Sequence, residues 1–408
     1  MSTARSRKTY PYPAEFVWRF VKDFFTPWHP RMSWCEQVDD HTRKFGMVGE
    51  DTVYVERLTV FDEAERRFEY EMLEGISGIE QYRGRVFVFP LVDNRAQIIW
   101  DAKISGPEAV TKRVAQGTEA VFQAGLDELA ELMKAVTTAQ TEWIPGSPKL
   151  AVDVAGEGDL VLFLHGIGGN RTNWHEQLSA LATSFKTAAL DFRGYGLSQL
   201  GNDAVTAQRL VDDIRRTLDY FDVQSAHLVG LSYGSWIAAC FGQLHPKRVA
   251  SITFCAGSSG MSEASEAEKG RFKALRLTPM EAGQTPADIA SAVVDALSGP
   301  EATPESRARL LASMKMIPRE TYVAALRCFL NPPFKINFEG FDFPTTFIAG
   351  EHDRLASPEE MGSVAQRVPN GKLYVVPRVG HLINVENPRR FTLLLLASLT
   401  GKQRPVNS

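Results

Sequence analysis

Only four cysteines occur among the 408 residues, and no two of them form a CxxC pair. Sparse, unpaired cysteines are typical of a reducing compartment, where thiols stay free. The chain also lacks an apolar run approaching the ~20 residues of a membrane-spanning helix; the longest such stretch near its end is LLLLA at 393–397. The opening residues, MSTARSRKTYPYP, have no apolar run behind their basic side chains and do not have the pattern of a secretory signal. We therefore expect a cytoplasmic protein that does not engage a membrane.

A large charge imbalance is missing as well. The 45 Lys and Arg against 49 Asp and Glu give a net charge of −4, so we expect no nucleic-acid partner. Apolar residues make up 44% and charged residues 23%, a balance that excludes disordered, fibrous and membrane classes. At ~100 to 200 residues per domain, the length favours two domains.

The first third of the chain predicts an α+β domain over residues 1–138. Apolar residues at helical spacing mark 14–25, four strand-like segments follow between about 51 and 104, and a long helix with one apolar stripe is predicted over 107–136. This order of elements resembles the SRPBCC or START-like helix-grip family, in particular its polyketide cyclase-like members. The resemblance implies a cavity for a hydrophobic ligand between sheet and long helix.

A second interpretation of this domain stays open, in which its own aromatic side chains fill the cavity. The candidates for filling it are Phe68, Tyr70, Phe87, Phe89 and Trp100. In that case the domain only packs against its neighbour.

Residues 137–149 are rich in Thr, Pro, Gly and Ser, and we expect a linker over 139–149 to a second domain over 150–408. There, fully apolar runs such as DLVLFL alternate with helical patterns, which is typical of a mostly parallel, doubly wound sheet covered by helices. The segment 258–343 interrupts this alternation with several helical patterns. Since unstructured loops of that length are uncommon, we expect a helical insertion.

The strongest chemical signal is Gly230-Leu231-Ser232-Tyr233-Gly234, which follows an apolar run and precedes a helical pattern. G-x-S-x-G between a strand and a helix predicts a strained turn that lifts the serine hydroxyl out of the sheet. Serine is a weak nucleophile, so it needs a base, which an acid must orient. Ser232 is the candidate nucleophile.

The candidate acid and base are Asp353 and His381, because each follows a strand-like run and they come in the order serine, acid, histidine. His245 and His352 also follow the serine. His245 precedes a proline at an expected helix end, and His352 would compete with Asp353 for the same turn. His381 alone comes after the acid.

The turn His165-Gly166-Ile167-Gly168-Gly169 follows an early strand and could aim a backbone N–H at an oxyanion. The expected donors are the amides of Ile167 and Tyr233. We interpret His165 as a brace for this turn. Pocket candidates are Asn170, Trp174 and Trp236, with core packing as the alternative for the two tryptophans.

Together, HGIGGN, DFRGYGLS, GLSYG and GEHDRLASP…VGHLINVENP resemble the α/β-hydrolase family over 142–400, with wording similar to enol-lactonase-like and carboxylesterase-like members. The resemblance implies that 258–343 is a cap over the active site. A serine nucleophile argues against the dehalogenases and epoxide hydrolases of this fold, which use an aspartate.

The primary hypothesis is a serine hydrolase that cleaves an ester or lactone of a small hydrophobic substrate through an acyl-enzyme, without a metal or an organic cofactor. Two alternatives stay open: a C–C bond hydrolase or cofactor-free tailoring enzyme for an aromatic or polyketide compound, and a hydrophobic-ligand sensor. Whichever of these holds, we expect the N-terminal domain to deliver or shield the hydrophobic compound, to form part of the pocket roof, or to make a homo-oligomer contact.

Overall fold

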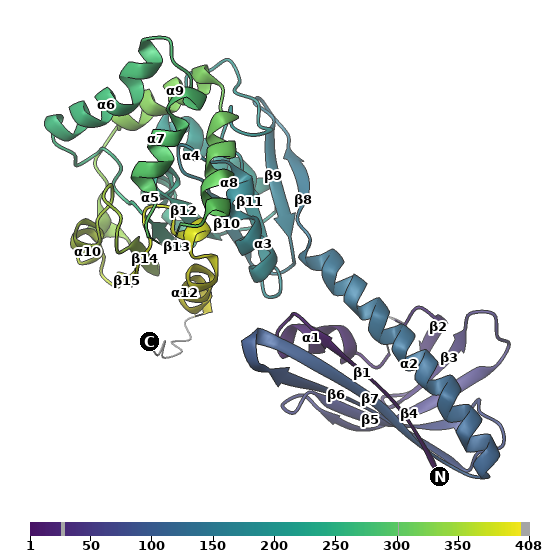
Figure 1. Cartoon of the computed structure of the whole chain (residues 1–408). Coiled ribbons are helices and arrows are strands. Elements are labelled where there is room, and N and C mark those ends of the chain that lie inside the picture. Colours follow the sequence, from purple (N-terminus) through teal and green to yellow (C-terminus); the bar gives the residue numbers. More distant parts are fainter. Residues whose placement is uncertain (26–28, 301, 401–408) are drawn as a thin grey trace. The chain divides into compact units, whose positions relative to one another are not determined.

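The computed structural model describes residues 1–25, 29–300 and 302–400. The chain divides into two compact units, Met1–Val136 and Thr137–Ser408 (Figure 1). The sequence placed this boundary two residues later. Each unit has its own sheet.

The first unit is a seven-stranded antiparallel sheet with the order β1-β7-β6-β5-β4-β3-β2. Its strands are β1 (Ser2–Tyr10), β2 (Met32–Gln37), β3 (Thr42–Met47), β4 (Val53–Asp62), β5 (Arg67–Glu74), β6 (Gln81–Leu91) and β7 (Arg95–Ser105), and its helices are α1 (Ala14–Val21), the short η1 (Val92–Asn94) and α2 (Glu108–Thr137).

The long helix α2 packs on this sheet through its predicted apolar stripe. Phe122, Leu126, Leu129 and Met133 are buried in one core with strand residues. The ring of Phe122 stacks on Trp100 at 4.3 Å between centroids. Strands β1, β2 and β3 were missed from the sequence. In β1, charged side chains alternate with the few inward-facing ones. Strand β2 buries none of its six residues, and β3 buries the charged Arg43.

The second unit has an eight-stranded sheet with the order β15-β14-β13-β12-β10-β11-β9-β8. The strands from β15 to β11 run parallel, and β9 and β8 are antiparallel additions at one edge. The strands are β8 (Gln140–Ile144), β9 (Leu150–Ala155), β10 (Leu160–Leu164), β11 (Lys186–Leu190), β12 (Ala226–Leu231), β13 (Val249–Cys255), β14 (Thr345–Gly350) and β15 (Lys372–Val376).

Helices cover both faces of this sheet, as the uniformly apolar strands predict. The core on one face includes side chains of α3 and α12, and the core on the other includes α4, α5 and α10. These helices are α3 (His175–Leu181), α4 (Ala207–Tyr220), α5 (Tyr233–Leu244), α10 (Pro358–Ala365), α11 (Ile383–Glu386) and α12 (Pro388–Thr400), with short turns η2 (Arg171–Trp174), η3 (Pro246–Arg248) and η4 (Phe338–Gly340).

The linker predicted over 139–149 is wrong in its first half. Gln140–Ile144 forms β8, which pairs with β9 in a hairpin and belongs to the second sheet. Only Ile144 of this strand is fully buried, so an edge strand with one inward side chain resembled a polar connection.

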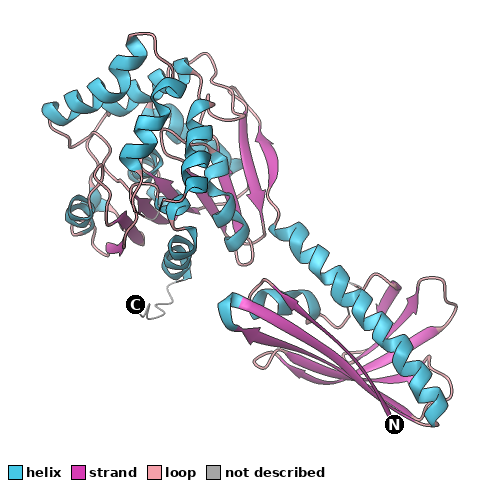
Figure 2. Ribbon diagram, viewed as in Figure 1, coloured by secondary structure: helices cyan, strands magenta, loops and turns pink. Residues whose placement is uncertain are grey.

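Between β13 and β14 lie four helices, which occupy most of the predicted insertion: α6 (Glu266–Glu281), α7 (Pro286–Leu297), α8 (Pro304–Lys315) and α9 (Arg319–Leu330). Figures 1 and 2 show them gathered at one end of the unit. We call the segment 258–343 the cap. In the described ranges, no helix combines the length and apolarity required to cross a membrane.

Candidate active site

Ser232 lies at the sharp turn between β12 and α5, with φ 54° and ψ −109°. This backbone conformation is costly for a residue with a side chain and persists only where the surroundings enforce it. The two flanking glycines permit it. A Cβ on Gly230 would lie 2.5 Å from the backbone of Gly234, and a Cβ on Gly234 would collide with the carbonyl of Leu164.

Asp353 and His381 form a buried pair at the ends of two neighbouring parallel strands. Asp353 follows β14, His381 follows β15, and Asp353 Oδ2 lies 2.8 Å from His381 Nδ1. The second carboxylate oxygen, Oδ1, accepts hydrogen bonds from the amides of Leu355 and Ala356 at 2.8 and 3.0 Å. The structure thus brings the two residues that were predicted as acid and base within hydrogen-bonding distance.

The environment of Asp353 keeps its carboxyl group ionised. Burial alone raises the pKa of Asp353, but the adjacent His381 and the hydrogen bonds from the ring and two amides outweigh burial and hold this pKa below its ordinary value. An ionised Oδ2 requires Nδ1 of His381 to donate the proton. Nε2 is then the ring nitrogen available to accept one.

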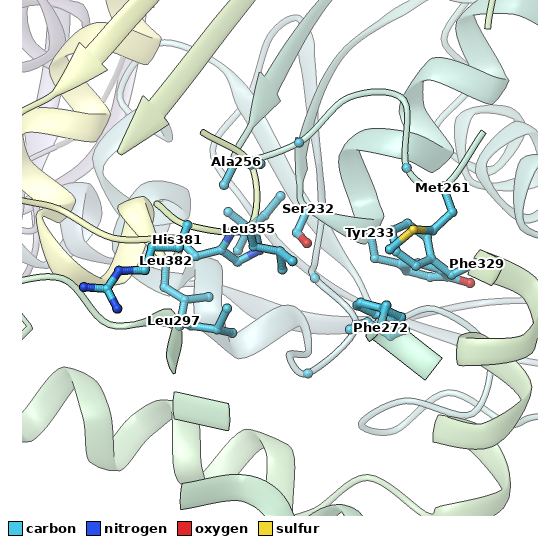
Figure 3. Close-up of a pocket in the computed structure, with 18 of the residues that line it drawn as sticks. Ser232, Tyr233, Ala256, Met261, Phe272, Leu297, Phe329, Leu355, His381 and Leu382 are labelled. Carbon is cyan, nitrogen blue, oxygen red and sulfur yellow. The ribbon is translucent and has the colours of Figure 1, made fainter. Parts of the chain in front are cut away.

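Ser232 and His381 line the same cavity, as Figure 3 shows for the serine hydroxyl and the imidazole. Among the described residues, no hydrogen bond joins these two side chains. Catalytic hydrogen bonds often tighten only when substrate is bound. The shared cavity therefore shows that the two side chains can meet the same bound molecule, although they are not hydrogen-bonded to each other.

Tyr233 and Ile167, whose amides are the expected oxyanion donors, both line this cavity. Tyr233 begins α5, so its N–H is one of the first helical donors, which have no intrahelical acceptor. The carbonyl of Gly166 accepts from Gly169 N at 3.0 Å within the turn. The N–H of Ile167 belongs to the same peptide unit as this carbonyl. Because a trans peptide is planar, the N–H points in the direction opposite to the carbonyl of Gly166.

His165 braces this turn through both ring nitrogens. Its Nε2 accepts from the amide of Phe192 at 3.1 Å, so Nδ1 carries the proton and donates to the carbonyl of Gly166 at 2.8 Å. Burial lowers the pKa of His165, which keeps the ring neutral. Tyr195 adds a hydrogen bond from its hydroxyl to the carbonyl of Ile167 at 3.0 Å.

A buried ion-pair network lies behind the turn. Arg171 bridges Asp153 and Asp191 at 2.8 and 2.6 Å, and Asp153 also accepts from Thr141 and His175 at 2.6 Å each. Burial opposes ionisation of Asp153, yet these hydrogen bonds and the Arg171 charge lower its pKa to about 2. The network fixes loop geometry rather than facing the cavity.

The cavity has a volume of about 840 Å³, and the cap supplies almost half of the residues that line it. Its apolar lining from the cap comprises Met261, Phe272, Leu275, Val293, Val294, Leu297, Leu310, Met314 and Phe329. Sequence reasoning named none of these residues. The sequence offered one signal for them. The helical patterns between 258 and 343 contain apolar residues, although no strand-like run lies in that segment for them to pack against.

The three predicted pocket residues do not line this cavity, and that prediction is wrong. Asn170 caps η2 by accepting from the amide of Thr172. Trp174 is buried in the core against Phe163. Trp236 lies behind the cavity wall, packed against Tyr233; both tryptophans thus follow the core-packing alternative.

The first unit contains a separate cavity of about 310 Å³. Phe68, Tyr70 and Trp100 line it without filling it, whereas Phe87 and Phe89 do not line it. Of the two interpretations, complete filling by the domain's own aromatics is therefore wrong.

One wall of this smaller cavity is polar. Arg43 and Glu56 form a buried pair at 2.6 Å, in which burial raises the pKa of Glu56 and Arg43 opposes the rise.

Over all the described ranges, no group of three or more His, Cys, Asp or Glu side chains is placed to hold a metal ion.

Two family models match the chain. Residues 159–388 match the alpha/beta hydrolase fold, and residues 1–134 match polyketide cyclase / dehydrase and lipid transport. The first match covers more than half of the chain.

Among curated relatives, the dihydrolipoyllysine-residue acetyltransferase component of the acetoin cleaving system of Pseudomonas putida is 36% identical over 113 residues, 28% of this chain and only 30% of the relative. The 3-oxoadipate enol-lactonase 1 of Acinetobacter baylyi is 23% identical over 59% of this chain and 90% of its own length. Among solved structures, a thermophilic esterase from Thermogutta terrifontis has a TM-score of 0.59 at 26% identity, covering 64% of this chain and 99% of the esterase.

Proposed function

The chain belongs to the alpha/beta hydrolase family, and from that premise we propose that it is a serine hydrolase cleaving a carboxylic ester or lactone of a small hydrophobic compound. The observation that carries the proposal is the buried Asp353–His381 pair, which faces the same cavity as Ser232 on its strained turn. The relatives named as an enol-lactonase and an esterase support the same reaction class.

In the proposed reaction, Ser232 Oγ attacks the carbonyl carbon while His381 Nε2 takes its proton. Asp353 holds the imidazole through Nδ1 and stabilises the imidazolium that forms. The amides of Ile167 and Tyr233 stabilise the oxyanion. His381 then returns the proton to the leaving oxygen, which yields an alcohol, or the ring-opened hydroxyl of a lactone, and an acyl-Ser232.

The second half of the reaction uses water. His381 Nε2 takes a proton from water, the resulting hydroxide adds to the acyl carbon, and Ser232 leaves as its proton is returned. The product is a carboxylic acid. This chemistry requires only the side chains named and water.

Apolar side chains dominate the cap wall of the cavity, and they favour a hydrophobic acyl or leaving group.

We also propose a cytoplasmic location. The four cysteines are free, and three of them are buried, which is compatible with a reducing environment.

The test is hydrolysis of p-nitrophenyl esters by wild type and by Ser232→Ala. Loss of the nucleophile costs on the order of 10⁶ in kcat in a well-studied serine hydrolase, so we expect turnover to fall to the background rate. Near-normal turnover by the variant would remove the assignment.

A further inference from the structure

Glu386 is a buried carboxylate five residues beyond His381, at the last position of α11. Its Oε2 accepts from the amide of Gly380 at 3.0 Å and its Oε1 from the amide of Leu382 at 3.3 Å. These two amides flank His381 on either side. One carboxylate thus holds the main chain directly before and directly after the base.

The same carboxylate also reaches the cap. Oε2 accepts a third hydrogen bond from the amide of Gly299 at 2.8 Å, just beyond the end of α7. The amide of His381 itself donates to the carbonyl of Leu297 at 2.9 Å, and Leu297 lines the cavity. Two hydrogen bonds therefore tie the His381 loop to the 297–299 segment.

Close backbone packing reinforces this connection. A Cβ on Gly350 would collide with the carbonyl of Gly380, one on Gly380 with the carbonyl of Leu297, and one on Gly299 with the amide of Gly380. The strand end before the acid, the loop of the base and the cap thus meet backbone to backbone. A small displacement of the cap at this point must move the loop that carries His381.

Hydrogen bonds to an ionised acceptor are roughly twice as strong as neutral ones, and a buried carboxylate is stable only when such donors satisfy it. Catalysis in turn depends on the placement of the base, because a misplacement of about 1 Å can cost on the order of 10² in rate. The carboxylate of Glu386 accepts three such hydrogen bonds, and two of them hold the segment that positions the imidazole of His381.

We propose that Glu386 is a positioning residue that clamps the His381 loop to the cap, so that the cap segment 297–299 sets the placement of the base. The proposal rests on the proposed function for the role of His381. It predicts that a substrate filling the cavity beside Leu297 is sensed directly by the loop of the base.

The test uses the full chain with Glu386→Ala, Glu386→Gln and, as a matched control, Leu218→Ala, a buried residue of α4 that does not line the cavity. The readouts are kcat and KM per active site titrated with a fluorophosphonate, and hydrogen exchange at the amides of 299, 380 and 382. Glu386→Ala should lower kcat on the order of 10²-fold, with little change in KM and faster exchange at all three amides.

The glutamine variant keeps one oxygen for Gly380 and Gly299 but presents an amide group to Leu382. We therefore expect a smaller loss of kcat, less than about tenfold, and faster exchange at Leu382 alone. The Leu218→Ala control should be less stable but have a normal kcat per titrated site.

Wild-type kcat and wild-type exchange in Glu386→Ala would overturn the proposal, and so would a kcat loss equal to that of the Leu218→Ala control. If the alanine variant does not fold, the glutamine variant decides by the same criteria. Failure of wild type to react with the fluorophosphonate would contradict the proposed function instead, while the exchange data would still test the clamp.

Discussion

At the scale of single residues, the second unit uses buried carboxylates for two different tasks. Asp353 holds a histidine that faces the cavity, whereas Asp153 holds Arg171 and His175 behind the 165–169 turn. Both pKa values lie below their ordinary ones. The difference in task comes from where the partner points, which a pKa alone does not reveal.

The low pKa of Asp153 predicts a pH-dependent contribution to stability. The folded-state pKa of about 2 lies below the ordinary 3.8, so the contribution is present above about pH 4 and is lost as pH falls from about 4 to 2. Its size is about 1–2 kcal/mol after allowance for screening near the half-exposed His175. The deficit of Asp153→Asn relative to wild type should therefore shrink between pH 6 and pH 3.

The measurement is the free energy of urea unfolding, followed by circular dichroism, for wild type and variant at both pH values. A deficit that stays constant or grows towards pH 3 would contradict this assignment of the Asp153 charge.

Residues also show how far the sequence could predict the site. The grouping of Ser232, Asp353 and His381 could be predicted, because the proposed chemistry requires these residue types at strand ends in a fixed order. Trp174 and Trp236 were not placed correctly, since a motif fixes the backbone path but not which side of a helix faces the cavity. Glu386 gave no signal, because its role depends on a contact with Gly299, 87 positions away in the chain.

At the scale of elements, the site depends on the close approach of the serine turn to β10. Gly234→Ala would place a Cβ against the carbonyl of Leu164, where no flexible side chain can yield. We expect a stability loss of about 1–3 kcal/mol together with a strong loss of kcat, measured by thermal denaturation and ester hydrolysis.

Gly270→Ala is the matched control, because a Cβ on Gly270 of α6 meets nothing within 4 Å. Replacing an exposed helical glycine should stabilise α6 by about 0.5–1 kcal/mol without loss of kcat. Equal behaviour of the two alanine variants would refute the packing argument for the serine turn.

The main elements followed from periodicity, and the exceptions have physical reasons. Fully apolar runs identified the parallel strands, because both of their faces are covered. The edge strands β1 and β8 bury only three of nine and one of five residues. Periodicity is weak in such strands, so β1 was missed and β8 was interpreted as a linker. Strands β2 and β3 were missed as well, since β2 buries none of its six residues and β3 buries the charged Arg43.

At the scale of the whole molecule, each unit encloses a cavity of its own, of about 840 Å³ beside Ser232 and about 310 Å³ in the first unit. We propose that the first unit delivers or shields a hydrophobic compound for the second. The cavity of the first unit supports this role, because it leaves room beside the aromatic side chains of Phe68, Tyr70 and Trp100.

Gly117 of α2 lines the smaller cavity, and a Cβ there would meet nothing within 4 Å. Gly117→Leu should therefore obstruct the cavity while favouring the helix by up to about 1 kcal/mol. We expect weaker binding of anilinonaphthalene sulfonate, followed by fluorescence, and no loss of p-nitrophenyl ester hydrolysis. In the control, Gln116→Leu, the same side chain is introduced at a neighbouring position outside the cavity lining; equal binding by the two variants would exclude this cavity as the binding site.

We propose that Ser232 is a nucleophile activated by His381, and covalent labelling tests this activation most directly. Folded full-length protein is treated with a fluorophosphonate, and the modified peptide is identified by mass spectrometry, with His381→Ala as a parallel sample. The account predicts one phosphonyl group on Ser232 in wild type and much slower labelling in the variant. An unmodified Ser232 in folded wild type, or labelling at the same rate without His381, would contradict it and favour a ligand-binding role for the second unit.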